Sequence, residues 1–414
     1  MQAHLFGRLL PALEARRRLL RAIVPISRIE AVRVDRAFGR VAARSIRAPT
    51  AVPPFDRATW DGYALRSADV QGASRGAPCH LRVVGEVFAE QTYPARLRPG
   101  EAVAIATGGA LPRGADAVEI FEEVVRDGPT VVLSAPVRPG VRIAPRGDDF
   151  PRGTLLVRRG EQLLPATLGA LAASGVARVP VYARPRVAIV PNGNELRAPG
   201  SRAGPGEIFE SNNAAISAVV AACGAEPVPM PPVRDEVAAI ESALRRALRS
   251  NDLVLATGGS SVGEHDHLPA IFPRLGRPLF HGLAVRPGKP TLAARSGRKV
   301  LVGLPGHPTS CLLNMQWLVL PALRRLARLP GPGWTARTAR LAGPAVNGLP
   351  GFTTVLPLRL DGDSVRSTFH SSSAIRGLGR AEAFAILAPG TKVLHAGTRL
   401  RVFVLDPPLG PRSG

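Results

Sequence analysis

The sequence predicts a multidomain α/β plus β protein built around a central three-layer α/β domain with a parallel-rich sheet. Between Val187 and Arg328, short apolar segments alternate with helical patterns, which is typical of parallel strands joined by helices on both faces of a sheet. The regions 81–141 and 336–405 instead contain short β-branched stretches separated by Gly/Pro turns. A length of 414 residues also exceeds one ordinary core, so we expect a β-rich insert domain and a small C-terminal β domain as well.

The N-terminal region predicts mixed α and β structure. Residues 9–29 combine leucines and arginines in the pattern of an amphipathic helix, which Pro25 should break before its end. We expect a short strand and a second small helix over 31–50, and a further helix near 166–174.

Each element of the α/β region has its own local signal. Ser211 and Asp235 are the expected N-caps of two helices, and Gly224 is the expected stop of the first. A long apolar helix is expected over 308–328, with a kink at Pro321. The strands predicted from apolar runs are 187–190, 227–229, 253–256 and 300–302.

The composition argues against several classes of protein. The formal net charge of +23 attracts anions, but nearly all basic residues are arginine, and the abundance of Arg, Ala, Pro and Gly indicates a compositional bias. We find no zinc-finger spacing and no aromatic-studded basic sheet, so no specific nucleic-acid partner is expected. No apolar run reaches about 18 residues, so no membrane span is expected. Cys79, Cys223 and Cys311 are far apart and odd in number, which favours the reducing cytoplasm over a disulfide framework.

The first candidate anion-binding loop is 257–266, which directly follows the predicted strand 253–256. Glycines permit close backbone approach, and amides and hydroxyls at the end of a parallel strand can hold a phosphate. Asp266 could hold a Mg²⁺ ion that bridges to the phosphate. An ordinary Gly-rich turn has the same local pattern. The residues assigned to substrate binding here are Gly258, Gly259, Ser260, Ser261 and Gly263.

A second loop, 303–310, again runs from a strand through a Gly-rich turn into a helix. Pro308 suits the first helical turn, and nearby hydroxyls lie at the positive end of the helix. A capped helix start would explain this loop alone, but two such loops after two parallel strands favour one shared anion site. The substrate-binding residues assigned here are Pro305, Gly306, His307 and Ser310.

The turn 286–290, Arg-Pro-Gly-Lys-Pro, carries one of only three lysines in the chain, and Arg286 and Lys289 are assigned to substrate binding. Several acids also lie near predicted turns, and metal-assisted cleavage of a phosphoanhydride needs such carboxylates. Most single acids in turns are solvated or cap helices, and Asp235 is also a good N-cap. These acids are Asp56, Asp61, Asp148, Asp149, Glu195, Asp235 and Asp266.

An ordered set of motifs resembles the molybdopterin molybdotransferase family, of the bacterial MoeA and gephyrin E-domain type. The resemblance runs from about Leu9 to Leu405; any one motif is weak, and the ordered set is specific. The family patterns are PPFD…MDGYAV, TG…P.GADAVV, RGED, TGDEL, SN, GGVSVGDYD, KPGKP, LPGNPVS and SS…ARAN.L. Their counterparts here are residues 53–64, 106–118, 146–149, 192–196, 211–212, 258–266, 286–290, 304–310 and 371–385.

The resemblance implies a transferase of molybdenum cofactor biosynthesis. Molybdate would be inserted into adenylylated molybdopterin, AMP would leave, and Mg²⁺ would assist. The family works as an elongated homodimer, with the active site between the α/β domain of one subunit and N-terminal parts of the other. The upstream adenylyltransferase and recipient molybdoenzymes are further candidate partners. By motif match, the catalytic residues are Asp61, Asp149, Glu195, Asp235 and Asp266; Asp61, Asp235 and Asp266 hold the metal; and Thr107 and Ser372 join the substrate-binding set.

The resemblance also implies domain boundaries. Residues 1–50 and 146–182 would form the elongated N-terminal dimerisation domain, and 51–145 the β-rich insert. Residues 183–330 would form the α/β domain of the molybdopterin-binding type, and 331–414 the C-terminal β domain.

The sequence departs from the family pattern at several positions. Trp60 replaces Met, Asn194 replaces Asp, His265 replaces Tyr, Arg286 replaces Lys and His307 replaces Asn. These changes leave open a catalytically silent or diverged paralogue that binds molybdopterin or the molybdenum cofactor. A third interpretation, the adenylyltransferase one step earlier, is disfavoured by the extra N-terminal and C-terminal segments.

Overall fold

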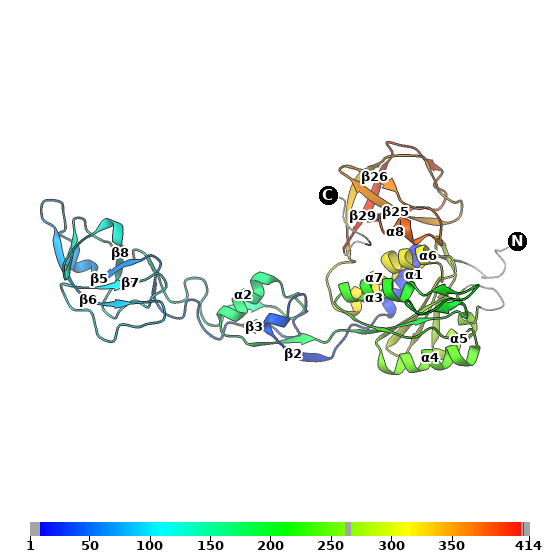
Figure 1. Cartoon of the computed structure of the whole chain (residues 1–414), viewed down its shortest axis with the longest axis horizontal. Helices are drawn as coiled ribbons and strands as arrows, with labels where there is room; N and C mark the ends of the chain where they lie inside the picture. Colours follow the sequence, from blue (N-terminus) through cyan, green and yellow to red (C-terminus); the bar gives the residue numbers. More distant parts are fainter. Residues whose placement is uncertain (1–8, 261–265, 407–408, 410–414) are drawn as a thin grey trace. The chain divides into compact units, whose positions relative to one another are not determined.

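The computed structural model describes residues 9–260, 266–406 and 409. The chain divides into two compact units (Figure 1). Unit 1 comprises Met1–Glu30, Gly39–Val41 and Tyr182–Gly414, and unit 2 comprises Ala31–Phe38 and Ala42–Val181.

The first sheet of unit 1 has six strands in the order β17-β14-β18-β22-β21-β19. The first four are parallel neighbours, whereas β21 is antiparallel to β22 and β19 is antiparallel to β21. Their bounds are β14 Arg186–Pro191, β17 Glu226–Pro229, β18 Leu253–Thr257, β19 Arg277–His281, β21 Leu292–Ser296 and β22 Lys299–Leu304.

Helices cover both faces of this sheet. Val187 and Ile189 of β14 pack with α1, α3, α6 and α7, whereas Ala188 and Val190 pack with α4 and α5 on the opposite face. This alternation follows from the two-residue period of a strand and explains why every residue of β18 is buried. The helices are α1 Ala12–Ala22, α3 Asn212–Ala222, α4 Val237–Ser250, α5 Leu268–Leu275, α6 Pro308–Asn314 and α7 Leu320–Leu326.

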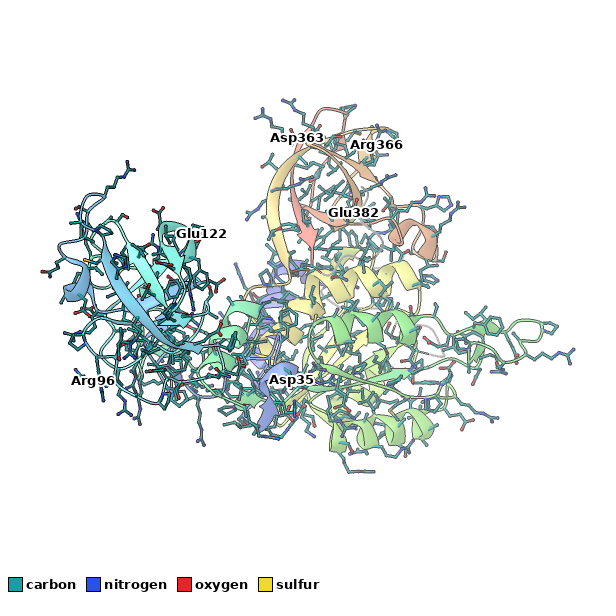
Figure 2. The ribbon with its side chains drawn as sticks, turned by 60° about the vertical axis from the view of Figure 1, so that its left-hand side comes forward. Asp35, Arg96, Glu122, Asp363, Arg366 and Glu382 are labelled. Atoms are coloured by element: carbon teal, nitrogen blue, oxygen red, sulfur yellow. The ribbon has the colours of Figure 1, made fainter. Side chains whose placement is uncertain are left out.

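A second sheet of unit 1 has seven strands in the order β1-β20-β25-β26-β23-β29-β27. Glu382 is buried beside it, and Asp363 and Arg366 extend from the β25–β26 end (Figure 2). The strands are β1 Leu10–Pro11, β20 Leu283–Arg286, β23 Trp334–Leu341, β25 Thr353–Asp361, β26 Ser364–Ser367, β27 Ala383–Leu387 and β29 Arg399–Leu405. The shorter elements of unit 1 are β15 Leu196–Arg197, β16 Ile208–Phe209, β24 Val346–Asn347, β28 Val393–Leu394 and α8 Ile375–Leu378.

Unit 2 contains another six-stranded sheet, in the order β8-β5-β7-β6-β10-β9. Its two faces carry separate apolar clusters, one around Leu65 and Leu81 and one around Val103 and Ile105. The strands are β5 Gly62–Leu65, β6 Cys79–Val87, β7 Glu101–Ile105, β8 Ala117–Ile120, β9 Val125–Asp127 and β10 Thr130–Leu133.

Shorter elements complete unit 2. The helix α2, Pro165–Ala173, matches the helix expected near 166–174. The second small helix expected over 31–50 is the 3-10 turn η1, Val34–Arg36. The remaining elements are β2 Ile29–Arg33, which spans the unit boundary, with β3 Ile46–Arg47, β4 Arg57–Ala58, η2 Ser67–Val70, η3 Phe121–Glu123, β11 Ile143–Ala144, β12 Leu155–Val157 and β13 Arg178–Tyr182.

Two predicted helices have different bounds in the structure. The N-terminal helix is shorter than expected, because residues 10 and 11 form β1 and the chain is extended again at Ile23, two residues before Pro25. The long helix over 308–328 is interrupted at a π turn, η4 Met315–Val319, and not at Pro321 itself. Pro321 lacks the N–H that would bond to the carbonyl of Trp317, so the change in hydrogen bonding falls within the preceding turn.

Ser211 occupies the expected N-cap position of α3 without a capping bond, whereas the N-cap predicted at Asp235 is wrong, because Glu236 precedes α4. Ser211 precedes α3 but adopts helical dihedral angles, and its hydroxyl makes no capping bond. The Glu210 carboxylate accepts the Asn213 N–H instead, at 2.9 Å. Asp235 does not cap α4, because its carboxylate accepts the N–H of Asn194 at 3.2 Å.

Candidate active site

Three parallel strands of the α/β sheet end at the same edge, and their loops are tied together by the backbone. The Asn192 N–H, after β14, donates to the carbonyl of Thr257 at 2.8 Å. The Gly258 N–H, after β18, donates to the carbonyl of Leu304 at 3.2 Å. Gly258 has φ +84°, and a Cβ there would lie 2.3 Å from the Asn192 oxygen, so only glycine fits this crossing. The two predicted loops are therefore joined at one edge of the sheet.

The first cavity at this edge, called the Asp266 cavity, has a volume of about 820 Å³. Its polar lining is rich in carboxylates. Ile208 and Phe209 add apolar side chains, which are 57% and 50% exposed. The predicted site residues that line it are Glu195, Asp235, Gly258, Gly259, Ser260, Asp266, Pro305, Gly306 and His307.

Asn194 and Asp235 hold each other in place at one side of this cavity. The Asn194 N–H donates to the Asp235 carboxylate at 3.2 Å, and the Asp235 N–H donates to the Asn194 amide oxygen at 3.1 Å. The His267 ring Nε2 lies 3.2 Å from the Asp235 carbonyl oxygen. An aspartate at position 194 would place a second negative charge against Asp235, so the neutral Asn194 removes a repulsion there.

Glu210 is a cavity residue that the sequence analysis missed. It lies beside Asn212, whose Nδ2 donates to the Gly306 carbonyl at 2.8 Å. Burial raises the pKa of the Glu210 carboxyl, and hydrogen bonds from the Asn213 and Asn212 N–H groups partly oppose that effect. Its position just before the predicted helix could have indicated that it caps the helix, but Ser211 is a residue type that caps helices more often.

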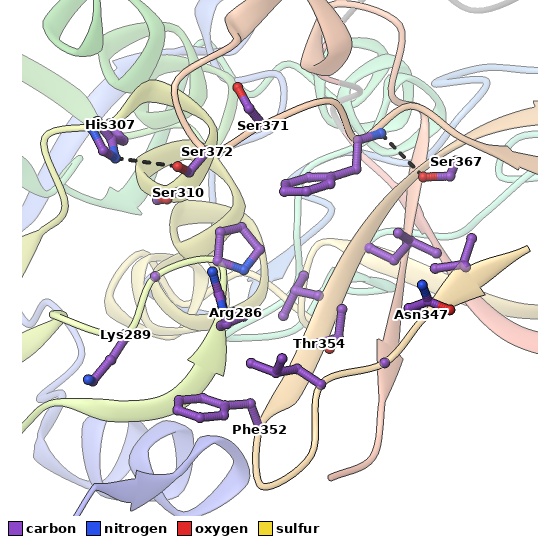
Figure 3. Close-up of a pocket in the computed structure, with 18 of the residues that line it drawn as sticks. Arg286, Lys289, His307, Ser310, Asn347, Phe352, Thr354, Ser367, Ser371 and Ser372 are labelled. Carbon is purple, nitrogen blue, oxygen red and sulfur yellow. Dashed lines mark hydrogen bonds between the residues drawn. The ribbon is translucent and has the colours of Figure 1, made fainter. Parts of the chain in front are cut away.

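The second cavity, called the Lys289 cavity, has a volume of about 1120 Å³. Figure 3 shows Arg286 and Lys289 on the α/β part, with Thr354 and Phe352 on the side of the C-terminal sheet. Strand pairing explains this arrangement, because β20 runs parallel to β25 and places Arg286 opposite Thr354. The predicted site residues that line the cavity are Arg286, Lys289, Pro305, His307, Ser310 and Ser372.

His307 lines both cavities, as do Pro290 and Pro305. The His307 Nδ1 lies 3.5 Å from the Ser372 Oγ, so the Gly-rich loop meets the C-terminal segment at this point (Figure 3). The Ser372 carbonyl also accepts the Thr309 N–H at 3.1 Å, and the Ala374 carbonyl accepts the Thr309 hydroxyl at 2.7 Å. A cation-lined cavity and a carboxylate-lined cavity therefore adjoin.

Asp61, Thr107 and Asp149 belong to unit 2. The Asp61 Oδ1 accepts the Thr107 N–H at 2.6 Å, and this bond, together with a side-chain bond from Thr107, lowers the pKa of the Asp61 carboxyl. Asp149 lies on a third segment, where its N–H donates to the Val52 carbonyl at 3.0 Å. Backbone pairing of β4 with β11, and of Arg57 with Ala110, joins these segments.

Two predicted residues, Ser261 and Gly263, lie outside the described residues, as does His265. Within the part of the chain that is described, no group of three or more His, Cys, Asp or Glu side chains is placed to hold a metal ion. None of its helices has the length and apolar character needed to cross a bilayer.

Family models and relatives identify the family of this chain. Residues 10–175 match the MoeA N-terminal region (domain I and II), and residues 188–325 match a probable molybdopterin binding domain. A molybdopterin molybdenumtransferase of Bacillus subtilis is 32% identical over 385 residues, which covers 91% of this chain and 90% of the relative. The chain belongs to the MoeA family of molybdopterin molybdenumtransferases.

Further members of the family support the same assignment. Molybdopterin molybdenumtransferase 2 of Mycobacterium tuberculosis is 31% identical, and the match covers 94% of this chain and 96% of that protein. A crystal structure of a MoeA protein from Pyrococcus horikoshii has a TM-score of 0.84 at 34% identity, covering 96% of this chain and 99% of that one. The MoeA fold thus extends over nearly the whole chain.

Proposed function

We propose that this chain inserts molybdate into adenylylated molybdopterin and releases AMP, as a transferase of molybdenum cofactor biosynthesis. The observation that carries the proposal is the junction of the two cavities at His307, one with cationic side chains and the other with carboxylates. The catalytically silent alternative is not favoured, because the curated relatives are named as transferases and the carboxylates Glu195, Asp235 and Asp266 line one cavity.

The Lys289 cavity suits the oxyanion. Arg286 and Lys289 supply positive charge, and Ser310 and Ser372 supply hydroxyl donors. A partly enclosed cation attracts an oxyanion more strongly than a surface cation, because less water screens the interaction. The cavity is much larger than one oxyanion, so the same space also admits part of the organic substrate.

The Asp266 cavity suits the phosphoanhydride end of the substrate. Backbone N–H groups of the Gly-rich loops provide donors for phosphate oxygens, and the exposed Ile208 and Phe209 provide an apolar surface for a flat ring. Asp235 and Asp266 offer the hard oxygen ligands that Mg²⁺ prefers, and two carboxylates with waters and substrate phosphates are a usual ligand set for this ion. When bound, the ion neutralises charge that develops on the leaving phosphate.

We further propose that Asp61, Thr107 and Asp149 take part in the same reaction and that the chain works as a homodimer. The Asp61 carboxylate is held ionised and oriented by Thr107, which supports a role in charge stabilisation. We place the reaction in the cytoplasm, which the free thiols of Cys79, Cys223 and Cys311 support. Candidate partners are the upstream adenylyltransferase and the recipient molybdoenzymes.

The proposal is tested by incubating the purified protein with adenylylated molybdopterin, molybdate and Mg²⁺, and measuring AMP. We expect AMP release that requires all three additions and is lost in Asp266→Asn. Release that persists without molybdate or Mg²⁺ would assign a different reaction to the site. The surface variant Asp363→Asn, on the C-terminal sheet, is the control for loss of one carboxylate.

A further inference from the structure

The turn 286–290 rests on a buried polar side chain of helix α6. The Asn314 Nδ2 donates to the Gly288 carbonyl at 3.2 Å, and the Thr291 Oγ1 donates to the same carbonyl at 2.8 Å. Gly288 has φ +113°, and a Cβ there would lie 1.9 Å from the Asn314 Nδ2. The backbone next to Lys289 is therefore in direct contact with the Asn314 amide.

The hydrogen bonds continue from Asn314 to two further side chains. The Asn314 Nδ2 also donates to the Thr291 Oγ1 at 2.7 Å, and the Asn314 Oδ1 accepts the Trp317 indole N–H at 2.6 Å. All three side chains have 0% exposure. Asn314 thus uses both amide hydrogens and its oxygen, as a buried amide must if it is not to lose stability.

This polar cluster joins two functional parts of the cavity wall. Helix α6 begins at Pro308, directly after His307, and carries Ser310 into the Lys289 cavity. Asn314 is its last residue, and Trp317 lies in the π turn that follows, a feature that is often found at functional sites. The far side of the turn is held by β20, because the Leu283 N–H donates to the Lys289 carbonyl at 2.8 Å.

We propose that Asn314, acting with Thr291 and Trp317, is a positioning residue that sets the location of the Lys289 ammonium in the oxyanion cavity. This inference rests on the proposed function, since it assigns to Lys289 the binding of molybdate. Asn314 holds the Gly288 carbonyl while the flanking prolines restrict the backbone. Lys289 therefore projects from a turn that is anchored to the same helix as Ser310, and the two oxyanion-binding groups keep a fixed spacing.

A positioning role for Asn314 predicts an effect on molybdate binding, which a purely stabilising role does not. Thr291→Val keeps the shape of the side chain but removes the hydroxyl that links Asn314 to Gly288. The matched control is Ser174→Ala in unit 2, where a fully buried hydroxyl donates to the Leu171 carbonyl at 2.9 Å. Both variants should lower the free energy of unfolding, but only Thr291→Val should weaken the binding of molybdate in the Lys289 cavity.

The experiment measures calorimetric affinity for inorganic molybdate alone, with urea unfolding in parallel. We expect Thr291→Val to raise the Kd for molybdate about fivefold or more, and Ser174→Ala to change it less than about twofold. Trp317→Phe, which keeps an aromatic ring, should show the Thr291→Val effect in weaker form. Equal, small changes in Kd for Thr291→Val and Ser174→Ala would overturn the proposal.

A double-mutant cycle separates this inference from the proposed function. In the Lys289→Ala background, Thr291→Val should produce no further loss of molybdate affinity, because the group that it positions is gone. Additive losses would show that Thr291 acts elsewhere and would overturn the positioning role. Failure of the unmodified protein to bind molybdate would contradict the proposed function. Molybdate binding that Thr291→Val leaves unchanged would contradict only the positioning role.

Discussion

Asp61 and Thr107 lie 46 residues apart in the sequence, and a hydrogen bond of 2.6 Å joins the Asp61 carboxylate to the Thr107 backbone N–H. The bond favours the ionised carboxylate, and with a side-chain bond from Thr107 it lowers the Asp61 pKa below its ordinary value. Two motifs of unit 2 thereby form one charged feature that stays ionised at neutral pH.

Asp61→Asn should retain this hydrogen bond but lose the charge. We expect kcat/KM for AMP release to fall by about a hundredfold, because a charge that stabilises a developing phosphate anion is commonly worth a few kcal/mol. The matched control is Asp69→Asn, since the Asp69 carboxylate also accepts a backbone N–H in unit 2, that of Gly100 at 2.9 Å. Similar losses in both variants would point to unit 2 stability as the cause.

Lys289→Ala should weaken molybdate binding more than alanine at the exposed Arg17, Arg245 or Lys392. A surface cation contributes only a screened share of the general positive field, whereas Lys289 lines the cavity. Affinities for molybdate and for the adenylylated pterin, measured at low and at physiological salt, test this. Equal losses in all four variants would show that bulk charge holds the anion, and the site around Lys289 would have to be abandoned.

Glu210 should make the stability of the protein depend on pH in a specific direction. Burial raises its pKa in the folded state, so the folded protein binds this proton more tightly than the unfolded chain. The stabilisation is complete below the ordinary carboxyl pKa and is lost as pH rises through the raised folded value. The urea unfolding free energy of the unmodified protein, minus that of Glu210→Gln, should therefore fall as the pH rises above the ordinary carboxyl pKa. A difference that stays constant or rises with pH would contradict a raised pKa of the Glu210 carboxyl.

Mixing two inactive variants tests whether Asp61 and Asp266 act from different subunits. If they do, co-expressed Asp61→Asn and Asp266→Asn chains should recover about one quarter of normal activity. Half of the dimers are then mixed, and one of the two sites in each mixed dimer is intact. Neither variant alone should recover. Complete inactivity of the mixture, with mixed dimers verified by mass, would place both carboxylates in the same chain.

The α/β part of the site could be predicted because its signals are local. A buried strand followed by glycines identifies a loop at a sheet edge, and parallel strands bring Gly258 and Leu304 together. The apolar wall of the Lys289 cavity depends instead on the pairing of β20 with β25, a non-local contact that no spacing in the sequence reveals.

Helix caps were harder to predict, because neighbouring side chains compete for the same free N–H groups at the start of a helix. Ser211 has the preferred residue type for an N-cap, but a cap normally needs extended dihedral angles, and Ser211 has φ −114° and ψ −25°. The longer Glu210 side chain reaches the free N–H of Asn213 instead. The division into four domains stays a prediction from the sequence.

The central claim is that this chain transfers molybdenum to the pterin dithiolene as AMP departs. The most direct measurement counts both products in one reaction: AMP by chromatography, and molybdenum cofactor by activation of a cofactor-free molybdoenzyme. We predict equal amounts of AMP and active cofactor, both dependent on molybdate and both lost together in Asp266→Asn. AMP release without formation of active cofactor would contradict the claim and would make the protein a hydrolase of the adenylylated pterin.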